Sequence, residues 1–191
     1  MVESIHDKSL IANTRIAVTH GDLHGDNLLV DSKNSPLVID FERCGEGHAL
    51  QDFTELETDI ITRLGTHMQS PYEYIKMFLF ILKHKELKEF DDLENFQTSD
   101  TKRIKKTIQV ISTIRSLALK CTGIRDAREY VFGLLFNIIF RATISHHKFQ
   151  DRGQHQALVL ASIACHRLDH WDEPSWPPAE WDSHLQVGEI Q

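Results

Sequence analysis

Residues 19–42, THGDLHGDNLLVDSKNSPLVIDFE, place the strongest constraint on how this chain can fold. Two short apolar runs flank the polar residues 32–35, and this pattern predicts a β-hairpin. A segment dense in aspartate, histidine and asparagine precedes the hairpin, and the second strand ends at Asp40. Carboxylate and amide oxygens arranged in this way favour a site for a divalent cation and phosphate groups.

One interpretation of this segment is phosphate-ester hydrolysis. GDLHG (21–25) resembles the Gly-Asp-x-His-Gly motif of calcineurin-like metallophosphoesterases, in which Asp22 and His24 would help to bind a two-metal centre. That fold needs further ligands from later strand ends. The later sequence contains neither Gly-Asp-x-x-Asp-Arg-Gly nor Gly-Asn-His, and the isolated DRG at 151–153 lacks the preceding Gly-Asp. Hydrolysis stays open as an alternative.

The other interpretation is phosphoryl transfer. The pattern His20-x-Asp22-x-x-x-x-Asn27 fits a catalytic loop in which the aspartate accepts the proton of a substrate hydroxyl and the asparagine binds a metal ion. Asp40 follows thirteen residues beyond Asn27, at the end of an apolar strand, where it can supply a second ligand. We therefore expect Asp22 to be the catalytic base, and Asn27 and Asp40 to hold the Mg²⁺ that accompanies ATP or another nucleoside triphosphate.

The stretches HGDLHGDNLLV and IDFE together resemble the catalytic loop and metal-binding segment of the aminoglycoside phosphotransferase and choline kinase group. This resemblance implies a protein-kinase-like fold and transfer of the nucleotide γ-phosphoryl group to a hydroxyl of a small molecule. The following stretch, GEGHALQDFTELE, resembles that group's glycine-containing turn and the start of its next helix. The same stretch is similar to the ternary-complex-associated domains of bacterial conflict systems.

The resemblance also implies roles for individual residues. His20 would support the backbone near Asp40, and Asp52 would be a structural cap or a loop anchor rather than a catalyst. His24, which we expect among the cofactor-binding residues, and Asp26 lie inside the loop, where each would contact substrate or metal, or else face solvent or brace the loop. Glu42 would either assist the metal ion or pair with a nearby arginine.

The part of a kinase that grips the nucleotide phosphates has no counterpart in this sequence. Only nineteen residues precede His20, and they contain no glycine and a single lysine, Lys8. A glycine-rich strand turn and a Lys–Glu pair do not fit into that length. The chain thus resembles the C-terminal lobe alone. Three explanations are open. The chain is a fragment of a longer protein, or a separate chain or domain supplies the nucleotide lobe, or the chain is a non-catalytic regulatory or interaction module.

Beyond the hairpin, apolar residues recur at helical spacing, so we predict a mainly α, α+β fold in which a helical bundle follows the metal-binding hairpin. A single domain, 1–191, would contain the catalytic loop and hairpin (15–42), a helical body (48–171) and a tail rich in proline and tryptophan (172–191). In this body we expect helices from Leu50 to Gly65, from Pro71 onward, around Ile104–Ala118, over a central core segment near 129–147, and at about 154–171.

Several helix faces can be assigned from this spacing. The first helix should pack through Phe53, Leu56, Ile60 and Leu64. The run 77–82 should be buried on most sides. One amphipathic face should contain Ile104, Ile108, Ile111, Ile114 and Ala118.

Charge and cysteine content exclude several classes of protein. The net charge of −7 argues against a nucleic-acid binder, and no apolar run is long enough for a signal peptide or a membrane span. The three cysteines form no CxxC pair, so a cytoplasmic location fits best. Cys165 should be a buried thiol.

Four further features have a functional and a structural interpretation. His166 and His170 are four residues apart on a predicted helix, as zinc ligands can be, but no third ligand is evident. The pair His146–His147 poses the same question. The tryptophans of the tail either fold back on the body or dock a partner, and we favour the first. Acidic residues at 55, 57 and 59 indicate either a cationic acceptor or surface charge.

Overall fold

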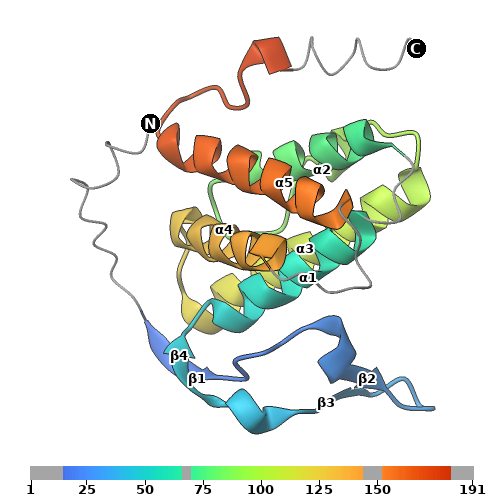
Figure 1. Ribbon diagram of the computed structural model, residues 1–191, viewed down its shortest axis with the longest axis vertical. Helices are drawn as coiled ribbons and strands as arrows, with labels where there is room; N and C mark the ends of the chain where they lie inside the picture. Colours follow the sequence, from blue (N-terminus) through green and yellow to red (C-terminus); the bar gives the residue numbers. More distant parts are fainter. Residues whose placement is uncertain (1–14, 66–69, 144–151, 182–191) are drawn as a thin grey trace.

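The structure is a computed structural model that describes residues 15–65, 70–143 and 152–181, and it contains a thin strand layer packed against a body of helices (Figure 1). The strands are β1 (Ile16–Thr19), β2 (Leu28–Val30), β3 (Pro36–Val38) and β4 (Gly45–His48). The helices are α1 (Gln51–Gly65), α2 (Pro71–Lys83), α3 (Thr101–Thr122), α4 (Arg128–Thr143) and α5 (Arg152–Asp169), with 3₁₀ turns at Gly25–Asn27, Phe41–Arg43 and Leu93–Asn95. The mainly α, α+β class is therefore as predicted.

The strand layer consists of two antiparallel pairs. β2 pairs with β3 as the predicted hairpin, with Leu28 opposite Val38. The turn is held by Asp31, whose Oδ1 accepts the backbone N–H groups of Lys33 and Ser35, both at 2.8 Å. β1 pairs with β4, with Thr19 opposite Gly45, and in Figure 1 the two strands lie side by side beneath the helices.

The strand β4 was not predicted, because GEGH was interpreted as a turn. Its sequence has no apolar alternation, so strand periodicity gives no signal there. Pairing with β1 determines its conformation instead. A Cβ atom on Gly47 would lie 2.6 Å from Gln51 Oε1 and 2.7 Å from Thr19 Oγ1, so a larger residue there would displace these side chains.

The helical body supplies the core, and two of its predicted faces are confirmed. Every residue from Met77 to Leu82 in α2 is buried. The five predicted apolar positions of α3 are also buried, from Ile104 to Ala118. Ser70 caps α2 by accepting the N–H of Glu73, and Gly123 ends α3 in a left-handed conformation.

The prediction for α1 is confirmed in part. Phe53 and Ile60 pack against the core but are only half-buried, Leu56 is half-buried, and the side chain of Leu64 lies outside the described part. The buried face is mostly polar and consists of Thr54, Glu57, Thr58, Asp59 and Ile61. Apolar periodicity cannot identify such a face, because most of its buried side chains are polar.

A buried ion pair explains this polar face. Glu57 and Arg115 are fully buried and meet through two hydrogen bonds, at 2.7 and 3.1 Å, while Tyr130 donates to Glu57 at 2.7 Å. Burial opposes the charge on Arg115, but the Glu57 carboxylate outweighs burial and raises the pKa of the guanidinium. Arg115 also donates to the carbonyl of Ile81. The pair therefore joins α1, α2, α3 and α4.

The helix α4 is less central than its sequence indicated. Tyr130, Leu134 and Ile138 are fully buried, but Phe136 and Phe140 on the same helix are 68% and 60% exposed. Close contact with α1 occurs at Gly133, where a Cβ atom would lie 2.9 Å from the Thr54 side chain.

The described part of the tail packs on α5, as favoured from the sequence. Trp176 donates its indole N–H to His166 Nδ1 at 3.1 Å, and Trp181 packs against the same imidazole. His166 and His170 stack, and His170 Nδ1 bonds to the carbonyl of His166 at 2.8 Å. The imidazoles thus have structural partners, which supports the structural interpretation over zinc binding.

Three other predictions concern the pair His146–His147, the burial of Cys165 and the absence of a membrane span. His146 and His147 lie outside the described residues. The prediction of a buried thiol at Cys165 was wrong, because this cysteine is exposed. Within the described ranges no helix is both long and apolar enough to cross a membrane.

Candidate functional site

The loop between β1 and β2 is fixed by acidic side chains of α1. Asp52 accepts the backbone N–H groups of His20 and Gly21, at 2.8 and 3.0 Å. Glu55 accepts that of Leu23 at 3.0 Å, and Asp59 accepts that of Gly25 at 2.9 Å. Positions 52, 55 and 59 lie on one face of a helix, so the three carboxylates form a row under the loop. Asp52 is therefore a loop anchor, as the resemblance implied.

Glycine is required at the start of the loop. Gly21 has φ +78°, and a Cβ atom there would lie 2.5 Å from the carbonyl oxygen of Arg43. A side chain would force the loop away from the segment that follows β3. The close approach brings Arg43 beside the site, where its Nη1 lies 3.9 Å from Asp22 Oδ2.

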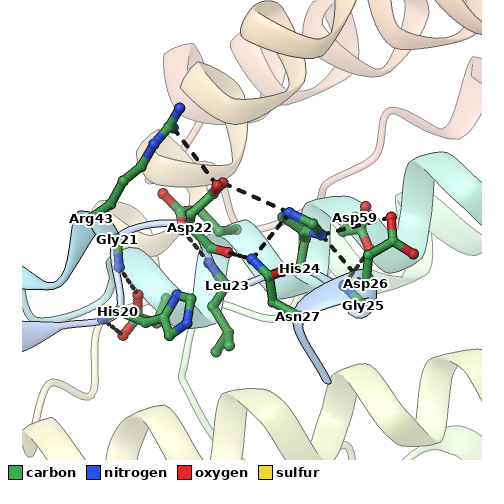
Figure 2. Close-up of polar contacts among 12 residues, drawn as sticks. His20, Gly21, Asp22, Leu23, His24, Gly25, Asp26, Asn27, Arg43 and Asp59 are labelled. Carbon is green, nitrogen blue, oxygen red and sulfur yellow. Dashed lines mark hydrogen bonds and ion pairs between the residues drawn. The ribbon is translucent and has the colours of Figure 1, made fainter. Parts of the chain in front are cut away.

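Asp22, His24 and Asn27 converge within this loop (Figure 2). The amide nitrogen of Asn27 donates to the carbonyl oxygen of Asp22 at 2.9 Å and lies 3.3 Å from His24 Nε2. His24 Nδ1 accepts the N–H of Asp26 at 3.3 Å. Nε2 is 4.0 Å from Asp22 Oδ1. The structure thus brings three of the four predicted site residues together.

Asp40, the fourth predicted site residue, is placed by its neighbours. Ile39 donates its N–H to the carbonyl of Asn27 at 3.1 Å, and its own carbonyl oxygen lies 2.8 Å from His20 Nε2. On the other side of Asp40, the ring of Phe41 packs against His20, with centroids 5.1 Å apart. His20 therefore contacts both residues that flank Asp40, which is the supporting role that the resemblance implied.

The backbone of Asp40 is in the left-handed region, with φ 64° and ψ 64°. Residues other than glycine adopt this conformation at a cost of about 1–2 kcal/mol, although aspartate tolerates it better than most. The contacts of His20 hold this conformation. It interrupts the strand direction of β3 immediately before the 3₁₀ turn Phe41–Arg43.

Asp26 belongs to a charged cluster at the far end of the loop. Arg63 forms a two-bond pair with Asp26 and also donates to Asp59 at 2.9 Å, while Arg141 reaches Asp59 at 3.2 Å. The hydrogen bond from Arg63 lowers the pKa of Asp26, and the same bond raises the pKa of Arg63. Asp26 therefore braces the loop against α1, which resolves its two open roles in favour of the structural one.

Several oxygen atoms of the predicted site residues accept no hydrogen bond from the described residues, although Asp22 lies 3.9 Å from Arg43 and 4.0 Å from His24. The carboxylates of Asp22 and Asp40 accept no hydrogen bond from any described residue, and neither does Oδ1 of the buried Asn27. Two carboxylates and an amide oxygen are hard oxygen donors of the kind that Mg²⁺ prefers. The residues present thus fit a magnesium ion.

The acidic residues of α1 do not form an acceptor pocket. Glu55 and Asp59 hold loop N–H groups, and Glu57 is buried against Arg115. These contacts remove the support for a cationic acceptor at these positions. Sequence reasoning missed the loop-holding role, although the spacing of Asp52, Glu55 and Asp59 on one helix face was a usable signal.

A second cluster of possible metal ligands lies away from this loop. Among the described residues, the one group of three His, Cys, Asp or Glu side chains close enough to share an ion is His84, Asp91 and Asp92. Lysines already pair with its carboxylates: Lys83 with Asp92, and Lys88 with Asp91 at 3.1 Å. No such group occurs at Asp22 and His24 in the described ranges, so a two-metal hydrolytic centre has no support there.

A family model, ternary complex associated domain 9, matches residues 5–137 of the chain. This match covers more than half of the sequence, and the chain belongs to that family. The similarity to ternary-complex-associated domains that the sequence indicated is thereby confirmed. No curated protein and no solved structure shows significant similarity to the chain.

Proposed function

We propose that this chain is a phosphotransferase-like domain, related to aminoglycoside phosphotransferases and choline kinases, that transfers the γ-phosphoryl group of ATP or another nucleoside triphosphate to a hydroxyl of a small molecule. The observation that carries this proposal is the contrast within the loop: its backbone N–H groups are bound by α1, while the oxygens of Asp22, Asn27 and Asp40 accept no hydrogen bond from described residues. Uncommitted oxygens on a fixed backbone suit a preorganised ligand site.

Each residue then has a defined task. Asp22 orients the acceptor hydroxyl and takes its proton. Asn27 and Asp40 hold Mg²⁺, which when bound would neutralise charge on the nucleotide phosphates. The imidazole of His24 lies beside Asp22, with Nε2 4.0 Å from Oδ1, where it could contact the cofactor. Arg43, on the opposite side of Asp22, adds a positive charge that suits phosphate oxygens.

The proposal includes a separate chain or domain that supplies the nucleotide lobe. The hairpin that leads to Asp40 has exposed apolar side chains at Leu29, Val30, Leu37, Val38 and Ile39, and Phe41 beyond it is 58% exposed. Successive residues of a strand point to opposite faces, so the hairpin has exposed apolar side chains on both faces, and such surface next to a polar site is typical of an interaction site. A cytoplasmic location is part of the proposal, and three exposed free cysteines support it.

The exposed apolar side chains of the hairpin also favour a second candidate, a non-catalytic interaction module with this fold. Both candidates use these side chains to bind a partner. They differ in whether Asp22, Asn27 and Asp40 bind a magnesium–nucleotide complex.

Thermal stabilisation by MgATP separates the two candidates. The melting temperature is measured with and without MgATP, for this chain alone and then together with the products of neighbouring genes. Phosphotransferase function requires a rise in at least one setting, and a rise only with a neighbour identifies a split enzyme. Asp40→Ala should abolish the rise, whereas Glu46→Ala, which removes an exposed carboxylate from β4, should leave it intact. Absence of any rise in both settings overturns the proposal.

A further inference from the structure

A cluster of three side chains that can bind a metal ion lies where the chain leaves α2. His84 follows the last residue of α2, and Asp91 and Asp92 lie just before the 3₁₀ turn Leu93–Asn95. Each side chain offers one ligand atom, and the three atoms lie within 4.8 Å of one another. Carboxylate oxygens and an imidazole nitrogen at such distances can share one ion.

The imidazole of His84 is held in place by contacts outside the cluster. Its ring stacks on Phe90, with centroids 4.0 Å apart, and packs edge-to-face with Phe80. Nδ1 lies 2.9 Å from the carbonyl oxygen of Phe80, and because a carbonyl oxygen only accepts, Nδ1 is the donor. Histidines that bind metal ions almost always make such a bond with the other ring nitrogen, which fixes the ring. The ring thus presents Nε2 to Asp92.

The contact between His84 and Asp92 requires a positive charge. Nε2 of His84 lies 2.9 Å from Oδ1 of Asp92. In the neutral ring with its hydrogen on Nδ1, Nε2 has only a lone pair, which would face a carboxylate oxygen. Either a second ring proton or a metal ion can supply the charge, and burial of His84 disfavours the proton. Two ligands at right angles on an ion with bonds of about 2.1 Å are about 3 Å apart, so the observed separation suits a metal ion.

Two lysines beside the cluster compete with an ion without excluding it. Lys83 pairs with Asp92, and Lys88 pairs with Asp91 at 3.1 Å. Both lysine side chains are partly exposed, and exposed ion pairs are weak. Lys83 also lies over the ring of Phe80, 4.3 Å from its centroid, so it keeps a partner when Asp92 binds an ion.

We propose that His84, Asp91 and Asp92 bind a first-row divalent metal ion such as Mn²⁺ or Zn²⁺. The ligands are Nε2 of His84 and one carboxylate oxygen of each aspartate, and water completes the coordination. Imidazole suits zinc and carboxylate suits manganese, and two carboxylates balance the charge of either ion. The ion would tie the end of α2 to the segment that leads into α3. This proposal does not depend on the phosphotransferase function proposed above.

Titration of the full chain with Mn²⁺ tests the proposal. Electron paramagnetic resonance measures free Mn²⁺, and nitrogen modulation of the electron spin echo detects coordination by an imidazole. Asp91→Asn, at an exposed position, should weaken this site at least about tenfold. Lys88→Ala removes a competing cation and should strengthen it by about fivefold. His84→Gln should abolish the nitrogen modulation, and Asp91→Asn keeps the test decisive if that variant does not fold.

Two controls distinguish this site from others on the chain. Asp169→Asn removes an exposed carboxylate beside His166 and His170 and should leave Mn²⁺ binding unchanged. Asp40→Ala removes a ligand of the proposed magnesium site and should leave the nitrogen modulation intact. Absence of the modulation in the full chain, or an affinity that is equal in Asp91→Asn, overturns the proposal. Loss of the modulation in either control also overturns it, because the ion then lies elsewhere.

Discussion

The helical body and the loop–hairpin layer use their charged residues in opposite ways. In the body, Glu57 is fully buried and bonded to Arg115 and Tyr130, so its charge serves the packing of four helices. In the layer, Asp22 and Asp40 keep their carboxylates free of hydrogen bonds from described residues. The acidic row on α1 lies between these regions and fixes the backbone of one against the other. Substitution of a charged residue in the body should therefore mainly lower stability, whereas substitution of one in the loop–hairpin layer should mainly weaken ligand binding.

The largest effect should come from breaking the buried pair. Arg115→Leu leaves the Glu57 carboxylate buried without its cation, and the free energy of unfolding should fall by about 3–5 kcal/mol. Urea denaturation measures this loss. The double variant Glu57→Leu/Arg115→Leu should recover a large part of it, because no unpaired charge remains. A loss below about 1 kcal/mol in the single variant would contradict the structural role of the pair.

An intermediate effect is expected at the boundary between the regions. Asp52→Ala removes the acceptor of two loop N–H groups and should lower the free energy of unfolding by about 1–3 kcal/mol. Glu46→Ala removes an exposed carboxylate of β4 and should change it by less than about 0.5 kcal/mol. Hydrogen exchange at His20 and Gly21 should accelerate only in Asp52→Ala. Unchanged exchange there would show that another group holds the loop.

A small effect of opposite sign is expected within the site. Asp40→Gly relieves the left-handed backbone conformation, so stability should stay constant or rise by up to about 1 kcal/mol, while any MgATP-dependent shift disappears. Asn34, with φ 61° in the hairpin turn, provides the matched control. Asn34→Gly should affect stability similarly and leave the MgATP shift intact. Loss of the shift in both variants would locate the effect in backbone flexibility rather than in the carboxylate.

The smallest effect should be a pH-dependent release of the tail. Burial, and next the neighbouring His170, lower the pKa of His166, with Asp169 and Glu173 opposing. The folded state disfavours the protonated imidazole of His166. Packing of the tail on α5 should therefore be complete above the pKa of about 6.5 that histidine has in an unfolded chain, and it should weaken as pH falls below that value. Tryptophan fluorescence from pH 7.5 to 5.0 measures this release. His166→Gln, which keeps an acceptor for Trp176, should flatten the change, and an equally steep change in that variant would assign it to other groups.

The sequence predicted those parts of the fold in which apolar periodicity and packing agree. The hairpin, the buried centre of α2 and the face of α3 all follow from spacing. It failed at β4, whose conformation depends on pairing with β1, and it missed that most of the fully buried positions of α1 are polar. It also overstated the burial of α4, because the apolar Phe136 and Phe140 are exposed.

The residues of the candidate site could be predicted from the sequence more easily than the residues that hold the loop in place. A motif fixes the spacing of Asp22 and Asn27, so their proximity could be anticipated. The hydrogen bonds from Glu55 and Asp59 depend on how α1 approaches the loop, which only the folded chain determines. Without that geometry, these acids could not be distinguished from surface charge.

The pairing of β1 with β4 has a consequence for how this domain can change. Thr19 lies opposite Gly45, so the chain leaves the β1–β4 pair and returns to it at adjacent points. A loop whose ends already meet can vary in length with little effect on the elements it connects. The segment 20–44 can therefore change in length as a unit. A longer hairpin could be inserted there without changing the arrangement of the helices.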